Sequence, residues 1–313
     1  MLPWFDGATI ARLARFDWLV EVLRAGFRSE VAAPPRPHYD LPQGRTLLLM
    51  PAWQDAWIGT KLVTIFPDNP QAGKPSIQGV YVLCSGTDGA PLALFDARAL
   101  TLWRTAAASA LAATYLAGRV QTLLVVGTGA LAPFLARAHA ALFAPSRILI
   151  WGRTPEKAAA LAATLRAEGY PATPVAELDT AIGEADLISC ATMSTEPLVR
   201  GALLRPGQHL DLVGSYRPHM READTEAVAR ATLFVDTFTA LEESGDLAIP
   251  IREGRLSANE VAADLAALCR SQHPGRTRPD EITLFKSVGC ALEDLVTAAA
   301  LWQRHSAMDP PAE

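Results

Sequence analysis

The segment LLVVGTGALAPFLARAH, residues 123–139, decides the fold. It places Gly127, Gly129 and Ala132 in a GxGxxA pattern between an apolar strand and an alanine-rich helix. Such glycines let the backbone turn sharply and approach a pyrophosphate, whose charge is stabilised at the helix N-terminus. The pattern alone is weak, but a second strand follows at RILIWGRT, residues 147–154. We therefore predict a dinucleotide-binding Rossmann domain rather than a merely structural glycine turn.

Downstream of this segment, short apolar runs alternate with helical segments. The runs are ADLISCAT (185–192), HLDLVGS (209–215) and TLFVDT (232–237), and the expected helices span 130–143, 155–168 and 221–230, with a helix-like segment at LVRGALLRPG (198–207). Strands that alternate with helices form a parallel sheet covered on both faces. The expected fold class is thus α/β, with a doubly wound parallel sheet over residues 117–286.

The residues before this domain have a different pattern. Helical spacing of apolar residues over 8–29 predicts one amphipathic helix, and three β-like runs (45–53, 57–67 and 77–85) predict an antiparallel sheet. A helix over 97–118 leads into the Rossmann domain, and TLFKSVGCALEDLVTAAALWQRH (283–305) reads as a long helix that packs back on the first domain. We expect a second, α+β domain at 1–116, completed by 287–313, with AMDPPAE (307–313) disordered.

Composition excludes several classes of protein. The 313 residues carry a formal net charge of -5, which gives no basic surface for nucleic acid. No apolar run reaches the roughly 18 to 20 residues of a membrane span, and the N-terminal MLPWFDGATI lacks a targeting pattern, so we expect a cytoplasmic protein. The four cysteines and six histidines are scattered, which predicts neither a metal site nor a disulfide framework.

The end of the second Rossmann strand bears on cofactor choice. An NAD site normally has an acid there, whereas Gly152 and Arg153 offer no acceptor and supply a guanidinium for a 2′-phosphate. This favours NADPH, with NADH possible but weaker, although a solvated surface arginine is the alternative. Ligands in such sheets bind beyond the carboxyl ends of the strands. The candidate cofactor-binding residues are Thr105, Gly127, Thr128, Gly129, Ala130, Leu131, Arg153, Thr154, Ala191, Thr192, Met193, Gly214 and Lys286.

Five segments carry a family resemblance over nearly the whole chain. They are GTKLVTIFPDNP (59–70), LTLWRTAAASALAA (100–113), VGTGALA (126–132), VGSYRPHMRE (213–222) and TLFKSVGCALEDL (283–295). Together they resemble the ornithine cyclodeaminase and mu-crystallin family. The resemblance implies a homodimer whose subunits have a Rossmann domain and a second domain, which forms the dimer interface and part of the substrate site. Members include ornithine cyclodeaminases, an archaeal-type alanine dehydrogenase and NAD(P)H-dependent ketimine reductases.

The resemblance also implies site residues. Arg45, Lys61 and Arg104 match family positions that hold the substrate carboxylate and line the reacting centre, and Ser215 joins them as a candidate for substrate binding. We expect Lys61 and Arg104 to be catalytic, because a guanidinium suits a small carboxylate and a buried lysine can carry a proton at neutral pH. Taken singly, the same residues also fit solvated surface positions. Thr105 is either a contact to the nicotinamide amide or a residue bonded to its own helical turn.

One segment departs from the cyclodeaminase pattern. Cyclodeaminases of the family have an aspartate two residues after the glycine of HLDLVG, where this chain has Tyr216. Asp211, within the strand, is an alternative acid, although strand residues alternate faces and the site lies at the strand end. GSYRPHMRE resembles the reductase branch instead. It implies an NADPH-dependent reduction of cyclic ketimine carboxylates, from pyrroline-2-carboxylate to L-proline or from piperideine-2-carboxylate to L-pipecolate.

Three other functions stay open at this point. An ornithine cyclodeaminase would recycle tightly bound NAD and release ammonia. An enzyme like alanine dehydrogenase would aminate a 2-oxo acid and need free ammonia. A non-catalytic protein, like mu-crystallin as a lens component, would bind NADPH without turning over an imine. Net consumption of NADPH with a preformed cyclic imine separates the reductase from all three.

Overall fold

The computed structural model describes residues 2–308, and they divide into two compact units. Unit 1 combines the residues up to Thr105 with those from Cys290 onward, and unit 2 is Ala106–Gly289. The first boundary lies within helix α3 (Ala97–Leu116), whereas the sequence suggested residue 116. An uninterrupted helix has no change of composition at which a boundary can be recognised.

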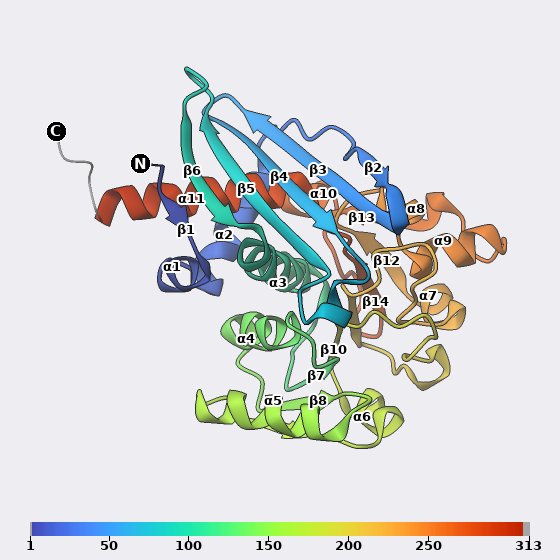
Figure 1. Cartoon of the computed structure of the whole chain (residues 1–313). Coiled ribbons are helices and arrows are strands. Elements are labelled where there is room, and N and C mark those ends of the chain that lie inside the picture. Colours follow the sequence, from blue (N-terminus) through green and yellow to red (C-terminus); the bar gives the residue numbers. More distant parts are fainter. Residues whose placement is uncertain (1, 309–313) are drawn as a thin grey trace. The chain divides into compact units, whose positions relative to one another are not determined.

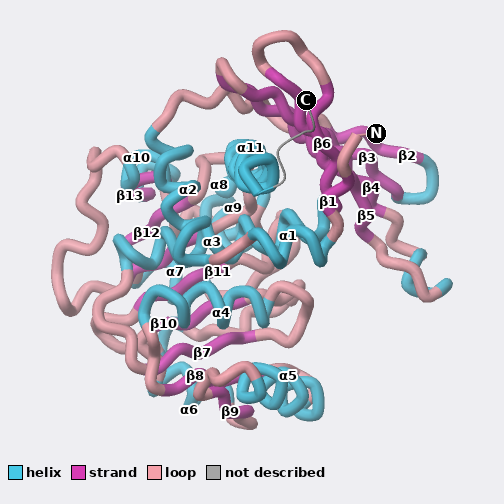
Figure 2. Tube along the Cα trace, turned by 90° about the vertical axis from the view of Figure 1, so that its left-hand side faces the viewer, coloured by secondary structure: helices cyan, strands magenta, loops and turns pink. Residues whose placement is uncertain are grey.

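Unit 2 is built on a parallel sheet of eight strands in the order β13-β12-β14-β11-β10-β7-β8-β9. Figure 2 shows β8, β7, β10 and β11 following one another across it. The order reverses between β7 and β10, as in a doubly wound sheet, which confirms the predicted fold class. The strands are β7 (Thr122–Val126), β8 (Arg147–Trp151), β9 (Ala172–Pro174), β10 (Leu187–Cys190), β11 (His209–Leu212), β12 (Thr232–Val235), β13 (Val261–Asp264) and β14 (Thr283–Lys286).

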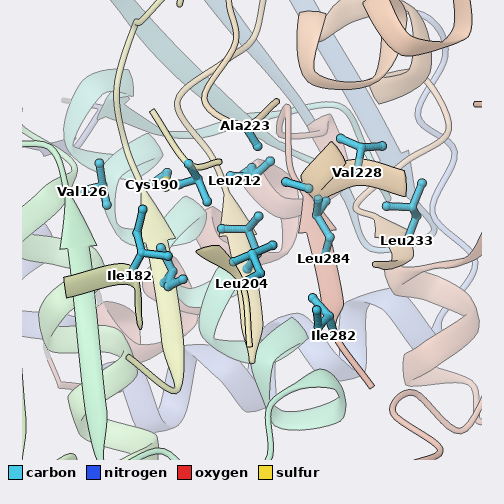
Figure 3. Close-up of a cluster of buried hydrophobic side chains, with 14 of the residues drawn as sticks. Val126, Ile182, Cys190, Leu204, Leu212, Ala223, Val228, Leu233, Ile282 and Leu284 are labelled. Carbon is cyan, nitrogen blue, oxygen red and sulfur yellow. The ribbon is translucent and has the colours of Figure 1, made fainter. Parts of the chain in front are cut away.

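Helices cover both faces of this sheet, because successive strand residues point to opposite sides. Leu123 and Val125 of β7 pack with α4 (Ala132–Phe143) and α5 (Pro155–Ala167) in one core. Leu124 and Val126 belong to the other core, part of which Figure 3 shows. Its helical side consists of α6 (Leu178–Glu184), η3 (Gly201–Leu203), α7 (Thr225–Arg230), α8 (Ala240–Glu243) and α9 (Gly245–Arg252). The remaining helices of the unit are η4 (Ala258–Glu260) and α10 (Leu265–Cys269).

Unit 1 contains a six-stranded sheet in the order β1-β6-β5-β4-β3-β2. Strands β2 to β6 are antiparallel neighbours, and β1 runs parallel to β6. Helix α11 (Ala291–Met308), red in Figure 1, lies across β3, β4 and β5 and packs on α2 (Phe16–Arg28). The other elements are β1 (Trp4–Phe5), α1 (Gly7–Leu13), β2 (His38–Leu41), η1 (Pro42–Gly44), β3 (Arg45–Gln54), β4 (Trp57–Ile65), η2 (Asn69–Ala72), β5 (Ile77–Ser85) and β6 (Pro91–Asp96).

Four sequence expectations need correction. The helix expected over 8–29 is two helices, since Ala14 and Arg15 are extended; the apolar spacing continues across the break and conceals it. The TLFK run is the buried strand β14 rather than the start of a helix, and α11 begins only after Gly289, whose φ is 76°. LVRGALLRPG forms only the short η3. Helix α11 includes the first two residues of AMDPPAE, and the others lie outside the described residues.

Some kinds of site are absent from the described residues. Among residues 2–308, no helix has both the length and the apolar character needed to cross a bilayer. Over the same range, no three His, Cys, Asp or Glu side chains converge as metal ligands would. The four cysteines are free thiols.

Candidate active site

In unit 1, two buried cations meet two buried acids. The Nζ of Lys61 lies 2.7 Å from Oδ2 of Asp294. Arg104 donates from Nε to Oδ1 of Asp294 at 3.0 Å and from Nη1 to Oε2 of Glu293 at 2.6 Å. All four side chains are buried. The structure thus brings the two expected catalytic residues together and adds two carboxylates to them.

The positions of these side chains follow from three elements. On β4, Gly59, Lys61 and Val63 are buried while Leu62 is exposed, so alternation turns Lys61 toward the face that α11 covers. Arg104 comes from α3, and the two acids lie in the first turn of α11, where the helix dipole stabilises negative charge. Gly59 has a steric role, because a Cβ there would lie 1.9 Å from Oη of Tyr81.

Burial and ion pairing act in opposite directions on these groups. Burial lowers the pKa of Lys61 to about 8, and the Asp294 carboxylate limits this shift. Burial would also lower the pKa of Arg104, but Asp294 and Glu293 raise it above its ordinary value. The pKa of Asp294 is lowered, since Arg104 and Lys61 outweigh the opposing effect of burial. Lys61 is therefore a group that can hold or release a proton near neutral pH, beside a permanently charged guanidinium.

Arg45 does not join this cluster. Met50 stands opposite Lys61 in the sheet register, and Arg45 lies five residues further along β3, about 17 Å away. Alternation directs it to the other face of the sheet, and its guanidinium lies 4.9 Å from the ring centre of Phe66. Arg45 and Lys61 are therefore too far apart, and on opposite faces of the sheet, to bind one small substrate together within unit 1.

A different arginine, Arg36, lies in the cross-strand row that contains Lys61. The N–H of Leu49 donates to the carbonyl of Pro37 at 3.2 Å, so Arg36 stands opposite Met50 in the continued register. Met50 is the register partner of Lys61, which puts Arg36 in the same cross-strand row as Lys61. Arg36 is half-buried. It received no role from the sequence, because the pairing of β2 with β3 was not foreseen.

In unit 2, the glycine turn after β7 has the features of a dinucleotide cradle. Gly127 has φ 124°, and a Cβ there would lie 2.7 Å from the carbonyl oxygen of Ala191. A Cβ on Gly129 would meet nothing within 4 Å, so this position opens outward. Within residues 2–308, the N–H groups that precede α4 have no protein acceptor, namely those of Thr128, Gly129, Ala130 and Leu131. Free N–H groups at a helix N-terminus fit a pyrophosphate.

The other candidate cofactor-binding residues differ in their exposure. Gly152 follows β8 and lies beside the glycine turn, since a Cβ there would lie 2.6 Å from Cγ2 of Thr128. Arg153 and Thr154 are exposed, and no protein group in the described residues pairs with the Arg153 side chain. Met193, beyond β10, is 70% exposed. Thr105, in unit 1, follows Arg104 on α3 and is buried.

Two candidates have side chains that are used inside unit 2. Ser215 is fully buried, and its hydroxyl donates to the carbonyl of Met220 at 2.8 Å and lies 2.6 Å from the hydroxyl of Ser244. Lys286 is also fully buried, with Nζ 3.2 Å from Oδ2 of Asp246. Contacts of the Ser215 hydroxyl with substrate, or of the Lys286 ammonium with cofactor, therefore do not fit this structure.

Asp211 does not replace the acid of the cyclodeaminases. Its carboxylate is wholly buried and accepts from Ser109 at 3.0 Å and from Ser189 at 2.6 Å. Nε2 of His139 lies 3.3 Å from it. Hydrogen bonds to these groups hold its pKa below the ordinary value although burial opposes this. Asp211 is a structural residue of the Rossmann core.

The sequence missed three acids that the structure brings out. Glu293 and Asp294 lie in KSVGCALEDL, and Glu222 ends VGSYRPHMRE, yet none had been given a role. The available signal was an acidic pair inside an apolar run, ALEDLVTAAAL, because buried acids require buried partners. Glu222 had no such signal, since its surroundings are polar in sequence.

Comparisons with known proteins agree with these motifs. The model of the ornithine cyclodeaminase/mu-crystallin family matches residues 8–309. Protein SAR DEFICIENT 4 of Arabidopsis thaliana is 42% identical over 281 residues, which are 86% of each chain. Delta(1)-pyrroline-2-carboxylate reductase of Colwellia psychrerythraea is 36% identical over 302 residues, 92% of this chain and 95% of its own.

A solved structure resembles the whole chain. It is that of Thermococcus litoralis Delta(1)-pyrroline-2-carboxylate reductase in complex with NADH and L-proline, with a TM-score of 0.92, 29% identity and coverage of 98% of both chains. Sequence motifs, family model and fold thus agree over nearly the full length. The chain belongs to the ornithine cyclodeaminase/mu-crystallin family.

Proposed function

We propose that this protein is an NAD(P)H-dependent reductase of cyclic imino acids, with pyrroline-2-carboxylate or piperideine-2-carboxylate as substrate. The observation that carries the proposal is the buried Lys61, held by Asp294 beside Arg104. The named reductases among its relatives support the same reaction. The missing acid after Gly214 argues against a cyclodeaminase, and the buried Asp211 offers no substitute.

In this proposal, unit 1 supplies the proton and binds the carboxylate of the substrate. When bound to unit 2, the reduced nicotinamide supplies the hydride. Lys61 holds a proton at the imine nitrogen, which makes the adjacent carbon a better hydride acceptor, and its pKa of about 8 keeps it protonated at neutral pH. Arg104 is fixed by its two acids and presents its remaining N–H groups to the substrate carboxylate. Arg36 takes the role first given to Arg45.

NADPH is the proposed cofactor. Arg153 is exposed at the end of β8, with no protein partner among residues 2–308, and no acid accompanies it there. A guanidinium in this place suits a 2′-phosphate and gives a ribose 2′-hydroxyl no acceptor. NADH would bind more weakly.

A homodimer is also part of the proposal. The second face of the unit 1 sheet exposes apolar side chains in adjacent register positions: Trp53 faces Ile58, and they are 45% and 40% exposed. Leu62, on the same face of β4, is 38% exposed. Contiguous apolar surfaces of this kind mark sites of protein association. In a two-fold dimer the same face of a second copy packs against it. Sedimentation of the purified protein tests this, and a monomer at all concentrations would exclude it.

The test of the reaction is direct. The purified protein is mixed with pyrroline-2-carboxylate and NADPH, without ammonia, and the nicotinamide absorbance is followed. We expect loss of the absorbance with one proline formed for each NADPH consumed. Ammonia release from ornithine with no net use of cofactor would identify a cyclodeaminase instead, and a requirement for ammonia with a 2-oxo acid would identify an alanine-dehydrogenase-like enzyme. Binding of NADPH with no turnover would leave a binding protein.

A further inference from the structure

A single buried carboxylate in unit 2 collects hydrogen bonds from the ends of two strands. Oε1 of Glu222 accepts from the N–H of Thr192 at 2.6 Å and from its hydroxyl at 2.9 Å. Oε2 accepts from the N–H of Gly214 at 2.7 Å and from that of Ser215 at 3.3 Å. Thr192 follows β10 and Gly214 follows β11, which are neighbours in the sheet. Glu222 thus ties two loops together at the carboxyl edge.

Glu222 is itself held in place by buried charges. The N–H groups of Glu222 and Ala223 donate to Oδ1 of Asp246 at 2.7 and 3.0 Å. Nζ of Lys286, at the end of β14, lies 3.2 Å from Oδ2 of Asp246 and 4.0 Å from Oε2 of Glu222. Glu222, Asp246 and Lys286 are all fully buried. This arrangement explains the position of Lys286, whose side chain has no access to a cofactor.

Two acids and one base in a buried site are costly to maintain. Burial raises the pKa of Glu222 to about 7 although Lys286 opposes the shift. An apolar set of residues would pack the same space at less cost in free energy. The Glu222 carboxylate does what an apolar side chain cannot, because it accepts hydrogen bonds from the N–H groups of two separate loops at fixed distances.

The two loops lie in the second half of the doubly wound sheet. Gly127 and Arg153 follow β7 and β8, which belong to the half of the sheet that takes the adenosine part of a dinucleotide. Strands β10 and β11 belong to the half that takes the nicotinamide part. Figure 3 shows Cys190 and Leu212 next to each other on β10 and β11, with Leu284 lower on β14. The approach of the loops is tight, because a Cβ on Gly214 would lie 2.0 Å from the carbonyl oxygen of Thr192.

We propose that Glu222 is a positioning residue for the nicotinamide half of the cofactor, and that it acts by fixing the spacing of the Thr192 and Gly214 loops. The inference rests on the proposed function, since it requires that unit 2 binds a dinucleotide. Met193, adjacent to Thr192, projects outward on the same loop. Glu222 touches neither cofactor nor substrate; it sets the surface on which the cofactor lies.

The test replaces Glu222 with glutamine. Glutamine has the same shape, but one carboxylate oxygen becomes an NH₂ group that faces the N–H donors of one loop. Dissociation constants are measured by fluorescence for NADPH and by competition for adenosine 2′,5′-bisphosphate, which lacks the nicotinamide half. For Glu222→Gln we expect the Kd for NADPH to rise about tenfold or more and the Kd for the bisphosphate to stay as in the wild type.

A matched control is Glu281→Gln. Glu281 also accepts N–H and hydroxyl groups, from Thr277 and Thr232, but it lies before β14 at the opposite edge of the sheet. Glu281→Gln should leave the Kd for NADPH and the Kd for the bisphosphate unchanged. Equal NADPH affinity in wild type and Glu222→Gln overturns the inference, as does an equal loss for both ligands. If the wild type binds neither ligand, the proposed function itself fails.

Discussion

Asp294 holds Lys61 and Arg104 with separate oxygens. Its Oδ2 lies 2.7 Å from Nζ of Lys61, and its Oδ1 accepts from Nε of Arg104 at 3.0 Å. The spacing of the two cations therefore depends on the orientation of one buried carboxylate. The same carboxylate is the main influence that keeps the pKa of Lys61 from falling further.

Asp294→Asn tests whether Asp294 sets both the spacing of Lys61 and Arg104 and the pKa of Lys61. An amide cannot offer an acceptor to both cations, so Lys61 loses its counter-charge and its pKa falls below about 8. If Lys61 must be protonated to act, activity declines as the pH rises through its pKa. We expect the alkaline limb of kcat/KM to move to lower pH, with kcat reduced by about 100-fold.

Asp17→Asn is the control for Asp294→Asn. It makes the same change at an exposed ion pair with Arg15 in unit 1 and should leave the profile as in the wild type. An alkaline limb that stays in place in Asp294→Asn would mean that Lys61 is not the titrating group. Thermal unfolding of both variants shows how much of any loss in kcat is loss of fold.

Arg36 and Arg45 can be distinguished by parallel substitutions. Arg36→Met should raise the KM for the imine by about tenfold or more, because it removes a charge-assisted hydrogen bond to the carboxylate. Arg45→Met should change the KM little, since Arg45 lies along the strand from Lys61 and on the opposite face. The reverse result in steady-state kinetics would contradict the register argument.

The Rossmann half was predictable because its signals are local. A glycine turn between a strand and a helix, and the alternation that follows, are contained in short windows around Gly127. The strand ending in Lys286 was misread because β14 has only four residues, too few to show a period that separates strand from helix. Tertiary packing decides that this segment is a strand, because it pairs with β11 and β12 in the sheet.

The site was predictable only in part. Lys61 and Arg104 were found through family motifs, but the partner of Arg104 is 190 residues away in sequence. No spacing rule links residues at such a distance. The position of Arg45 outside the Lys61 row has the same origin, because that row is fixed by strand pairing, and the pairing brings in Arg36.

Arg153 should decide the choice between the two cofactors. Arg153→Asp removes the partner of the 2′-phosphate and adds an acceptor for a ribose hydroxyl. We expect the Kd for NADPH to rise about 10- to 100-fold while that for NADH falls. Arg153→Met is the matched control, since it removes the charge without adding the acceptor, and it should weaken NADPH without improving NADH. Unchanged preference in fluorescence titrations would mean that the 2′-phosphate is held elsewhere.

Gly127→Ala tests the cradle itself. The substitution forces a side chain into a backbone with φ 124° and places Cβ 2.7 Å from the carbonyl oxygen of Ala191, so the turn must shift. Gly169→Ala is the matched control: its φ is 93°, in the same unit, but a Cβ there meets nothing within 4 Å. Each variant should lose about 1–3 kcal/mol of stability to backbone strain. Only Gly127→Ala should also lose NADPH binding, because only there does the strain move the N–H groups that would receive the pyrophosphate. If both variants bind NADPH as the wild type does, the dinucleotide does not lie on this turn.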